Sequence, residues 1–168
     1  LSHDKKQFSD KIMINDIACN AQKIKNDFLN LIDRDTRAFD DLMTSFRLPK
    51  KTNKDINFRN KEIIKMSKLV TEVPFETLTK SLDAINLIFD ILSIGNQNCL
   101  SDVGTAAEMA YSCAYGAYYN VKINLIDLRR EDQKYCLKMT QKSDEIISKV
   151  NDKIFKIRDQ VLEDLNHE

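Results

Sequence analysis

The fold of this chain is indicated most clearly by two blocks, Asn96-Gln-Asn-Cys-Leu-Ser-Asp-Val-Gly-Thr-Ala-Ala107 and Gly116-Ala-Tyr-Tyr-Asn-Val-Lys-Ile-Asn-Leu125. They combine turn asparagines, a Ser-Asp helix start, a run of small residues and two asparagines four positions apart. Ser101 is a preferred helix N-cap residue, and Asp102 complements the dipole of a helix that begins there. The blocks predict a helix from Ser101 to about Leu128 that is buried, closely approached by its neighbours, and polar at both ends of one face.

The rest of the chain also favours helices over strands. Only three glycines and two prolines are present, and strand-rich folds need many turns. Apolar residues recur instead at steps of three and four, the spacing of one buried helical stripe. We therefore expect an all-α fold, a compact bundle of long helices in one domain over residues 1–168. The expected helices cover 9–46 (one helix, or two with a bend), 56–73, 74–94, 101–128 and 131–165.

Turn-forming residues separate the expected helices. Pro49 ends the first one, because proline disfavours helix in the residue before it. Pro74 is expected to open a new helix, since proline is tolerated in a first turn. Gly95 stands where a C-terminal cap belongs, and 96–100 are expected to form a polar turn.

Composition excludes several classes of protein. The 26 basic and 26 acidic residues cancel, so the chain lacks the basic footprint of a nucleic-acid-binding protein. No apolar run approaches the roughly 18 residues of a membrane span, and no signal peptide is visible. The four cysteines are widely spaced, without a CxxC motif, as is typical of reduced thiols in a cytoplasmic protein. The two histidines lie at opposite ends of the chain and do not favour a metal site.

One carboxylate interrupts the apolar stripe of the first helix. Ile24, Phe28 and Leu31 predict an apolar residue at the next step, and the sequence places Asp35 there before the stripe resumes at Phe39. Burial raises the pKa of a carboxyl group toward values that are useful in acid–base catalysis. Asp35 is therefore a candidate acid–base group. The alternative is a buried aspartate that links two helices through hydrogen bonds.

Asp33, two positions earlier, points elsewhere and is expected to pair with Arg37 on the solvated surface. Lys50, after the Leu-Pro turn, is either solvated or available to an anionic ligand tail. These charged groups are therefore expected to differ from Asp35 in their surroundings.

One face of the central helix is also unusual: its central residues have small side chains, and the residues at both ends are polar. Its members are Asp102, Ala106, Ala110, Cys113, Ala117, Asn120 and Asn124. Buried polar groups need partners, so one interpretation is an alanine-rich packing face whose asparagines bond to loop backbone. The other is a cleft in which amide and carboxylate groups recognise a heteroaromatic ligand.

At these residues the chain resembles the cyclodeaminase domain of formimidoyltransferase-cyclodeaminase and the related bacterial methenyltetrahydrofolate cyclohydrolases. The last matching block, with an aromatic pair before Asn120, is closer to the bifunctional animal-type enzyme. The blocks that match in order and spacing are Lys6-Gln-Phe, Leu31-Ile-Asp-Arg-Asp-Thr-Arg-Ala-Phe39, Leu48-Pro-Lys50, Val73-Pro74, Gly95-Asn96, Ser101-Asp102, Ala106-Ala107 and Gly116-Ala-Tyr-Tyr-Asn-Val-Lys-Ile-Asn-Leu125.

The resemblance implies an all-α enzyme of one-carbon metabolism and histidine degradation that assembles from dimers. The implied reaction converts 5-formimidoyltetrahydrofolate to 5,10-methenyltetrahydrofolate and ammonia, with tetrahydrofolate as substrate carrier and no metal. The family's catalytic aspartate corresponds to Asp35, and Asp102, Asn120, Asn124 and Lys50 become candidate folate ligands.

The resemblance leaves two other functions open: a cyclohydrolase, and a non-catalytic helical homologue that serves as an assembly subunit. Family members begin with a glycine-rich segment of the Pro-x-Pro-Gly-Gly-Gly-Ser type and an alanine-rich helix, which this sequence does not contain. We expect either that an upstream segment is missing, with or without a transferase domain before it, or that the chain is a divergent homologue.

Overall fold

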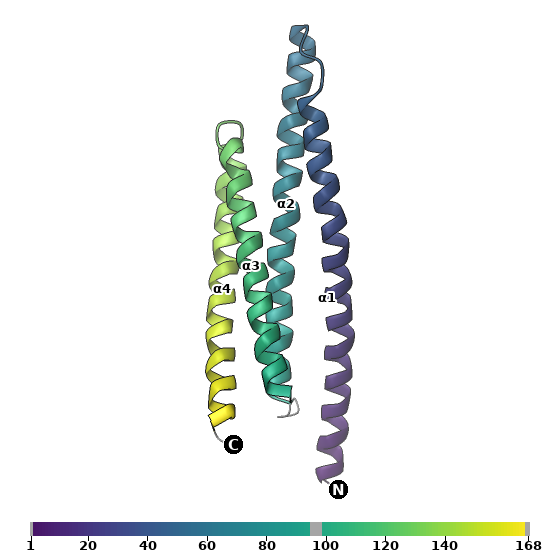
Figure 1. Cartoon of the computed structure of the whole chain (residues 1–168), viewed down its shortest axis with the longest axis vertical. Helices are drawn as coiled ribbons and strands as arrows, with labels where there is room; N and C mark the ends of the chain where they lie inside the picture. Colours follow the sequence, from purple (N-terminus) through teal and green to yellow (C-terminus); the bar gives the residue numbers. More distant parts are fainter. Residues whose placement is uncertain (1, 95–98, 167–168) are drawn as a thin grey trace.

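The computed structural model describes the backbone of residues 2–94 and 99–166 and the side chains of 11–94 and 99–166. Within these ranges the chain forms helices and no strands, which confirms the all-α prediction. The helices are α1 (Ser2–Phe46), α2 (Asn53–Leu92), α3 (Leu100–Leu128) and α4 (Gln133–Asn166). Figure 1 shows successive helices running in opposite directions along one long axis.

Helix α2 is the centre of the arrangement. It packs extensively against α1, α3 and α4, and α3 packs against α4. Helices α2, α3 and α4 therefore enclose a shared core, in which Leu78, Ile85, Val150 and Ile154 are fully buried. Helix α1 lies against α2, on the far side from α4 (Figure 1). One consequence is that a side of α1 remains open along much of its length.

The first helix is continuous, so of the two sequence-based alternatives the single long helix is correct. The turn at Pro49 is where it was expected, between Phe46 and Asn53. A reciprocal capping box begins α2: the Thr52 hydroxyl accepts from the Asp55 N–H at 3.2 Å, and the Asp55 carboxylate accepts from the Thr52 N–H at 3.0 Å. This box satisfies two backbone donors that the start of a helix leaves free.

The expected division of the second helix at Pro74 is wrong, because α2 continues through this proline. Proline has no N–H to donate to the carbonyl four residues earlier, which here belongs to Val70. The Asn124 side chain supplies the missing donor from α3, with its Nδ2 2.8 Å from the Val70 oxygen. The helix therefore tolerates proline because a neighbouring helix replaces the lost bond.

The start of α3 also differs from expectation. The helix begins at Leu100, with Cys99 at the N-cap position and no capping bond from its side chain. Ser101 lies inside the first turn and does not cap it, while Asp102 lies in the first turn as predicted, and the end at Leu128 is confirmed. Helix α2 ends with Ser93 as its C-cap; the predicted cap at Gly95 and part of the predicted turn over 96–100 lie outside the described residues.

The buried side of α3 is rotated from the predicted one. Its buried residues are Leu100, Ala107, Ala114, Ala117, Val121, Leu125 and Leu128. Most of the predicted face, including Asp102, Cys113 and Asn120, is exposed. The reason is that α1 packs on α2 and leaves this side of α3 uncovered. The same arrangement leaves Phe39 and Phe46 of α1 exposed, at 55% and 45%, although the apolar stripe predicted their burial.

Candidate functional site

A cavity of about 550 Å³, here called cavity A, lies among α1, α2 and α3. Its volume is within the usual range of small-molecule sites. The lining includes two residues that the sequence singled out separately, Asp35 and Asn120. The residues around it are Phe28, Leu31, Ile32, Asp35, Thr36, Pro74, Thr77, Cys113, Gly116, Ala117 and Asn120.

Asp35 is exposed at the edge of cavity A, which corrects the prediction that it is buried. A buried stripe does run past Asp35, because Leu31 and Ala38, one turn on either side, are only 4% and 2% exposed, but it continues through Ala38 and not through the predicted Phe39. Small residues on α3, among them Gly116 and Ala117, line the cavity with Asp35 and leave it open. The Asp35 carboxylate makes no ion pair or hydrogen bond with any side chain that the structure describes, so it is free to act on a ligand.

Gly116 shows how α3 keeps cavity A open. A Cβ atom built at this position would meet no atom within 4 Å. The glycine is thus not required by a closely packed neighbour, contrary to the expected close approach along this face. Asn120, one turn further, is exposed, and its side chain makes no hydrogen bond within the described part of the chain. Its amide is available as both donor and acceptor.

The threonines of cavity A are less available, and no pattern in the sequence singled them out. The Thr36 hydroxyl donates to the Ile32 carbonyl at 3.2 Å, and the Thr77 hydroxyl donates to the Val73 carbonyl at 3.1 Å. Each hydroxyl retains its capacity to accept a hydrogen bond. The helical spacing of Pro74 and Thr77 places both on the side of α2 that lines the cavity.

Asp33 has different surroundings from Asp35 despite its position only two residues away. It is exposed and does not line cavity A. The expected ion pair with Arg37 is not formed, because the Arg37 Nε donates to the backbone carbonyl of Asp33 at 3.1 Å and not to its carboxylate. Asp33 is therefore a suitable internal control for Asp35.

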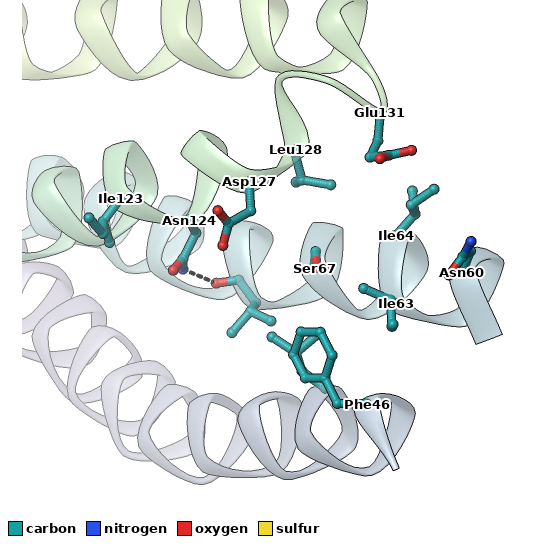
Figure 2. Close-up of a pocket in the computed structure, with 12 residues that line it drawn as sticks. Phe46, Asn60, Ile63, Ile64, Ser67, Ile123, Asn124, Asp127, Leu128 and Glu131 are labelled. Atoms are coloured by element: carbon teal, nitrogen blue, oxygen red, sulfur yellow. Dashed lines mark hydrogen bonds between the residues drawn. The ribbon is translucent and has the colours of Figure 1, made fainter. Parts of the chain in front are cut away.

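A second cavity of about 440 Å³, cavity B, continues along the same sides of the three helices toward the α3–α4 turn. It contains Asn124, the remaining candidate asparagine, whose amide donates to Val70 (Figure 2, dashed line). The structure thus separates the two asparagines. Asn120 faces cavity A without a partner, and Asn124 supports the backbone beside Pro74.

The other two candidate residues lie away from cavity A. Asp102 is in the first turn of α3, eighteen positions before Asn120, which corresponds to roughly 27 Å of helix. Lys50 is exposed in the turn after α1 and lines neither cavity. Among the residues that the structure describes, no group of three or more histidine, cysteine or acidic side chains is placed to hold a metal ion.

Charged pairs fix α4 against α3, behind the face that carries cavity A. Arg158 makes two bonds to the Glu108 carboxylate, at 2.6 and 2.7 Å, and these lower the pKa of Glu108. Burial raises the pKa of Asp144, but hydrogen bonds from Lys122 and Tyr118 outweigh it, so the net pKa is lowered. These contacts hold the α3 backbone, and hence its small residues, in place.

Within 2–94 and 99–166, no helix combines the length and the apolar character needed to cross a membrane.

Residues 1–145 match the family model described as formiminotransferase-cyclodeaminase. The chain is 32% identical to the formimidoyltransferase-cyclodeaminase of Gallus gallus over 139 residues, which cover 80% of this chain and 25% of that protein. It is 30% identical over 104 residues to a methenyltetrahydrofolate cyclohydrolase of Methylorubrum extorquens, covering 62% of this chain and 50% of the other. The chain therefore spans between a quarter and a half of these two relatives.

The fold is similar to that of formiminotetrahydrofolate cyclodeaminase from Thermotoga maritima, with a TM-score of 0.66 at 20% sequence identity. The similarity covers 84% of this chain and 67% of the Thermotoga chain. This likeness concerns the fold.

Proposed function

The chain belongs to the formiminotransferase-cyclodeaminase family, and from this premise we propose that cavity A binds a folate and performs the cyclodeaminase reaction. The substrate is 5-formimidoyltetrahydrofolate, and the products are 5,10-methenyltetrahydrofolate and ammonia. The observation that carries the proposal is the meeting, in one cavity, of the unpartnered Asp35 carboxylate and the unpartnered Asn120 amide.

The reaction needs one group that first accepts and then returns a proton. The N10 atom of the folate attacks the carbon of the protonated amidine on N5, and a new N10–C bond forms. N10 then transfers its proton to the Asp35 carboxylate, which gives a neutral aminal. The resulting Asp35 carboxylic acid protonates the amino group, the C–N bond breaks, and ammonia leaves with the proton. The positive charge remains on the methenyl product, so atoms and charge balance.

The position of Asp35 suits this task. Its carboxylate lines the cavity and is not engaged by any side chain of the described residues, so both oxygens can reach the substrate. General acid–base assistance of this kind contributes about a hundred- to ten-thousand-fold in rate. In the unreacted complex the same carboxylate faces the cationic amidine and orients it through charge.

Asn120 and the apolar lining supply orientation. The Asn120 amide can accept from an amidine or pterin N–H and donate to a pterin carbonyl. Phe28, Leu31 and Ile32 offer apolar surface to the pterin ring. Holding N10 near the amidine carbon lowers the entropic cost of ring closure.

The second candidate reaction is hydrolysis of 5,10-methenyltetrahydrofolate to 10-formyltetrahydrofolate. It is favoured by the similarity to the Methylorubrum extorquens protein, whose name is methenyltetrahydrofolate cyclohydrolase. Water then attacks the methenyl carbon and gives one proton to the Asp35 carboxylate, which leaves a neutral hydroxy adduct. The C–N5 bond breaks as N5 takes the proton back from Asp35 and the hydroxyl proton passes to solvent, so the formyl group remains on N10. The same cavity and the same carboxylate serve either reaction.

Self-association completes the proposal. Leu29, Ile32 and Phe39 on α1 are 56%, 64% and 55% exposed, and Met109 on α3 is 70% exposed. Large apolar side chains that gather on one open side are typical of interaction surfaces. A second copy of the chain would cover them and remove water from cavity A. Sedimentation equilibrium would show a dimer or larger assembly that dissociates when Ile32 is replaced by Glu.

Two parallel assays test the proposed reaction on the purified chain. With 5-formimidoyltetrahydrofolate, cyclodeaminase activity releases ammonia and methenyl product in equal amounts. With 5,10-methenyltetrahydrofolate, cyclohydrolase activity removes the methenyl absorbance faster than buffer does. If neither substrate is consumed, but the chain binds a tetrahydrofolate and Asn120→Leu weakens this binding, the chain is a folate-binding homologue without catalysis.

A further inference from the structure

Cavity B has a different chemical character from cavity A. Its floor is apolar and includes Phe46 from α1 and Ile63 and Ile64 from α2. Its polar side carries the carboxylates of Asp127 and Glu131, near the end of α3 (Figure 2). An apolar body bounded by a few polar groups is the usual composition of a small-molecule site.

The charge of cavity B is wholly negative, since no lysine, arginine or histidine lines it. Asp127 and Glu131 make no ion pair or side-chain hydrogen bond with any residue that the structure describes. Four cationic side chains of α2 adjoin the lining residues in sequence, namely Arg59, Lys61, Lys65 and Lys68, and none of them lines the cavity. Arg59 donates to a backbone carbonyl of α1 at 3.3 and 3.4 Å, and Lys68 pairs with Asp132 at 2.6 Å.

We propose that cavity B binds a small organic cation, in which a primary ammonium or a guanidinium group is attached to an apolar body. The cationic group lies between Asp127 and Glu131, and the apolar body packs on Phe46, Ile63 and Ile64. This site does not depend on the reaction proposed for cavity A, because Asp35 and Asn120 lie outside it.

Both parts of such a ligand are needed for affinity. An exposed ion pair alone contributes little, because water and salt screen it. An apolar body removes water from the cavity floor, and the lower local dielectric then strengthens the attraction to the carboxylates. A neutral molecule of the same shape is expected to bind roughly tenfold more weakly, because it loses the attraction of the cation to two partly exposed carboxylates.

Methyl NMR spectroscopy of the full chain, labelled at isoleucine δ1 methyl groups, tests the site. The probe is 2-phenylethylamine, which is protonated at neutral pH, and 2-phenylethanol is its neutral counterpart. Ile63, Ile64 and Ile123 line cavity B, whereas Ile32 lines cavity A. We expect saturable shifts of the first three signals with the amine, and no comparable shift at Ile32.

The double variant Asp127→Asn/Glu131→Gln is expected to weaken amine binding at least about tenfold. The double variant Asp152→Asn/Glu163→Gln removes the same charge from exposed positions of α4 and should leave binding unchanged. Unchanged methyl spectra without ligand will show that both variants are folded. Equal binding of the alcohol, retained affinity in the first variant, shifts confined to Ile32 or no saturable binding would each overturn the proposal.

Discussion

The bond between Asn124 and Val70 leads to a double-mutant prediction about how α2 passes Pro74. Replacing Asn124 by Ala removes the donor that is 2.8 Å from the Val70 oxygen. Val70 is only 8% exposed, and a buried acceptor without a partner costs about 1–3 kcal/mol. Cavity B adjoins this carbonyl and admits water, so we expect the lower part of that range, about 1–2 kcal/mol.

The variant Pro74→Ala tests the cause of this cost. Alanine restores an N–H at position 74, which can donate to the Val70 carbonyl within α2. In that background Asn124→Ala should cost less than about 0.5 kcal/mol, which gives a coupling energy of about 1 kcal/mol. Loss of side-chain packing at position 124 is the same in both backgrounds and cancels in the cycle.

Urea unfolding followed by circular dichroism at 222 nm measures the free energy of unfolding of the unmodified chain, the two single variants and the double variant. A change of 1 kcal/mol corresponds to roughly 2–4 °C in Tm for a chain of this size. Asn120→Ala is the matched control, because Asn120 is the same residue type one turn earlier and its side chain makes no hydrogen bond in the described part of the chain. Equal destabilisation by Asn124→Ala in both backgrounds would refute the reasoning.

Three further variants address cavity A and the α3–α4 contacts. Gly116→Ala should stabilise α3 by about 0.5–1 kcal/mol, since its methyl group meets no atom within 4 Å and alanine favours helix; thermal unfolding measures this. Asn120→Leu should weaken tetrahydrofolate binding in calorimetry without lowering Tm; a lower Tm with unchanged binding would assign Asn120 to packing. Because the pKa of Glu108 is lowered from 4.5 by Arg158, the stability from this pair is present above that value and is lost as the pH falls below it. Arg158→Met should therefore flatten the acid limb of a plot of urea midpoint against pH, and an unchanged limb would contradict the assignment.

Much of the fold could be predicted from local pattern. Three- and four-residue apolar spacing identified all-helical structure, and the capping signals and Pro49 placed several helix ends within a few residues. Pro74 shows where local reasoning fails. The donor that lets α2 continue lies 54 positions away from the carbonyl that it satisfies, so no rule based on neighbouring residues could include it.

The candidate site shows a similar limit. The interrupted stripe correctly placed Asp35 one turn after the buried Leu31, but the buried stripe continues through Ala38 and not through the predicted Phe39. The exposure of Asp35 is set by the arrangement of the helices. Because α1 packs on α2 and small residues of α3 line the opposite side, an open cavity remains where burial was expected. The position of Asp35 and Asn120 in one cavity likewise depends on the tertiary structure, although patterns in the sequence had singled out each residue separately.

Turnover by matched aspartate variants tests the proposed catalysis most directly. The purified chain, Asp35→Asn and Asp33→Asn are each mixed with 5-formimidoyltetrahydrofolate, and methenyl absorbance and ammonia are followed together. We predict product formation by the unmodified chain and by Asp33→Asn, and a loss of about a hundredfold or more in Asp35→Asn, whose helical circular dichroism stays unchanged. Equal turnover by Asp35→Asn and the unmodified chain would contradict the role of this carboxylate.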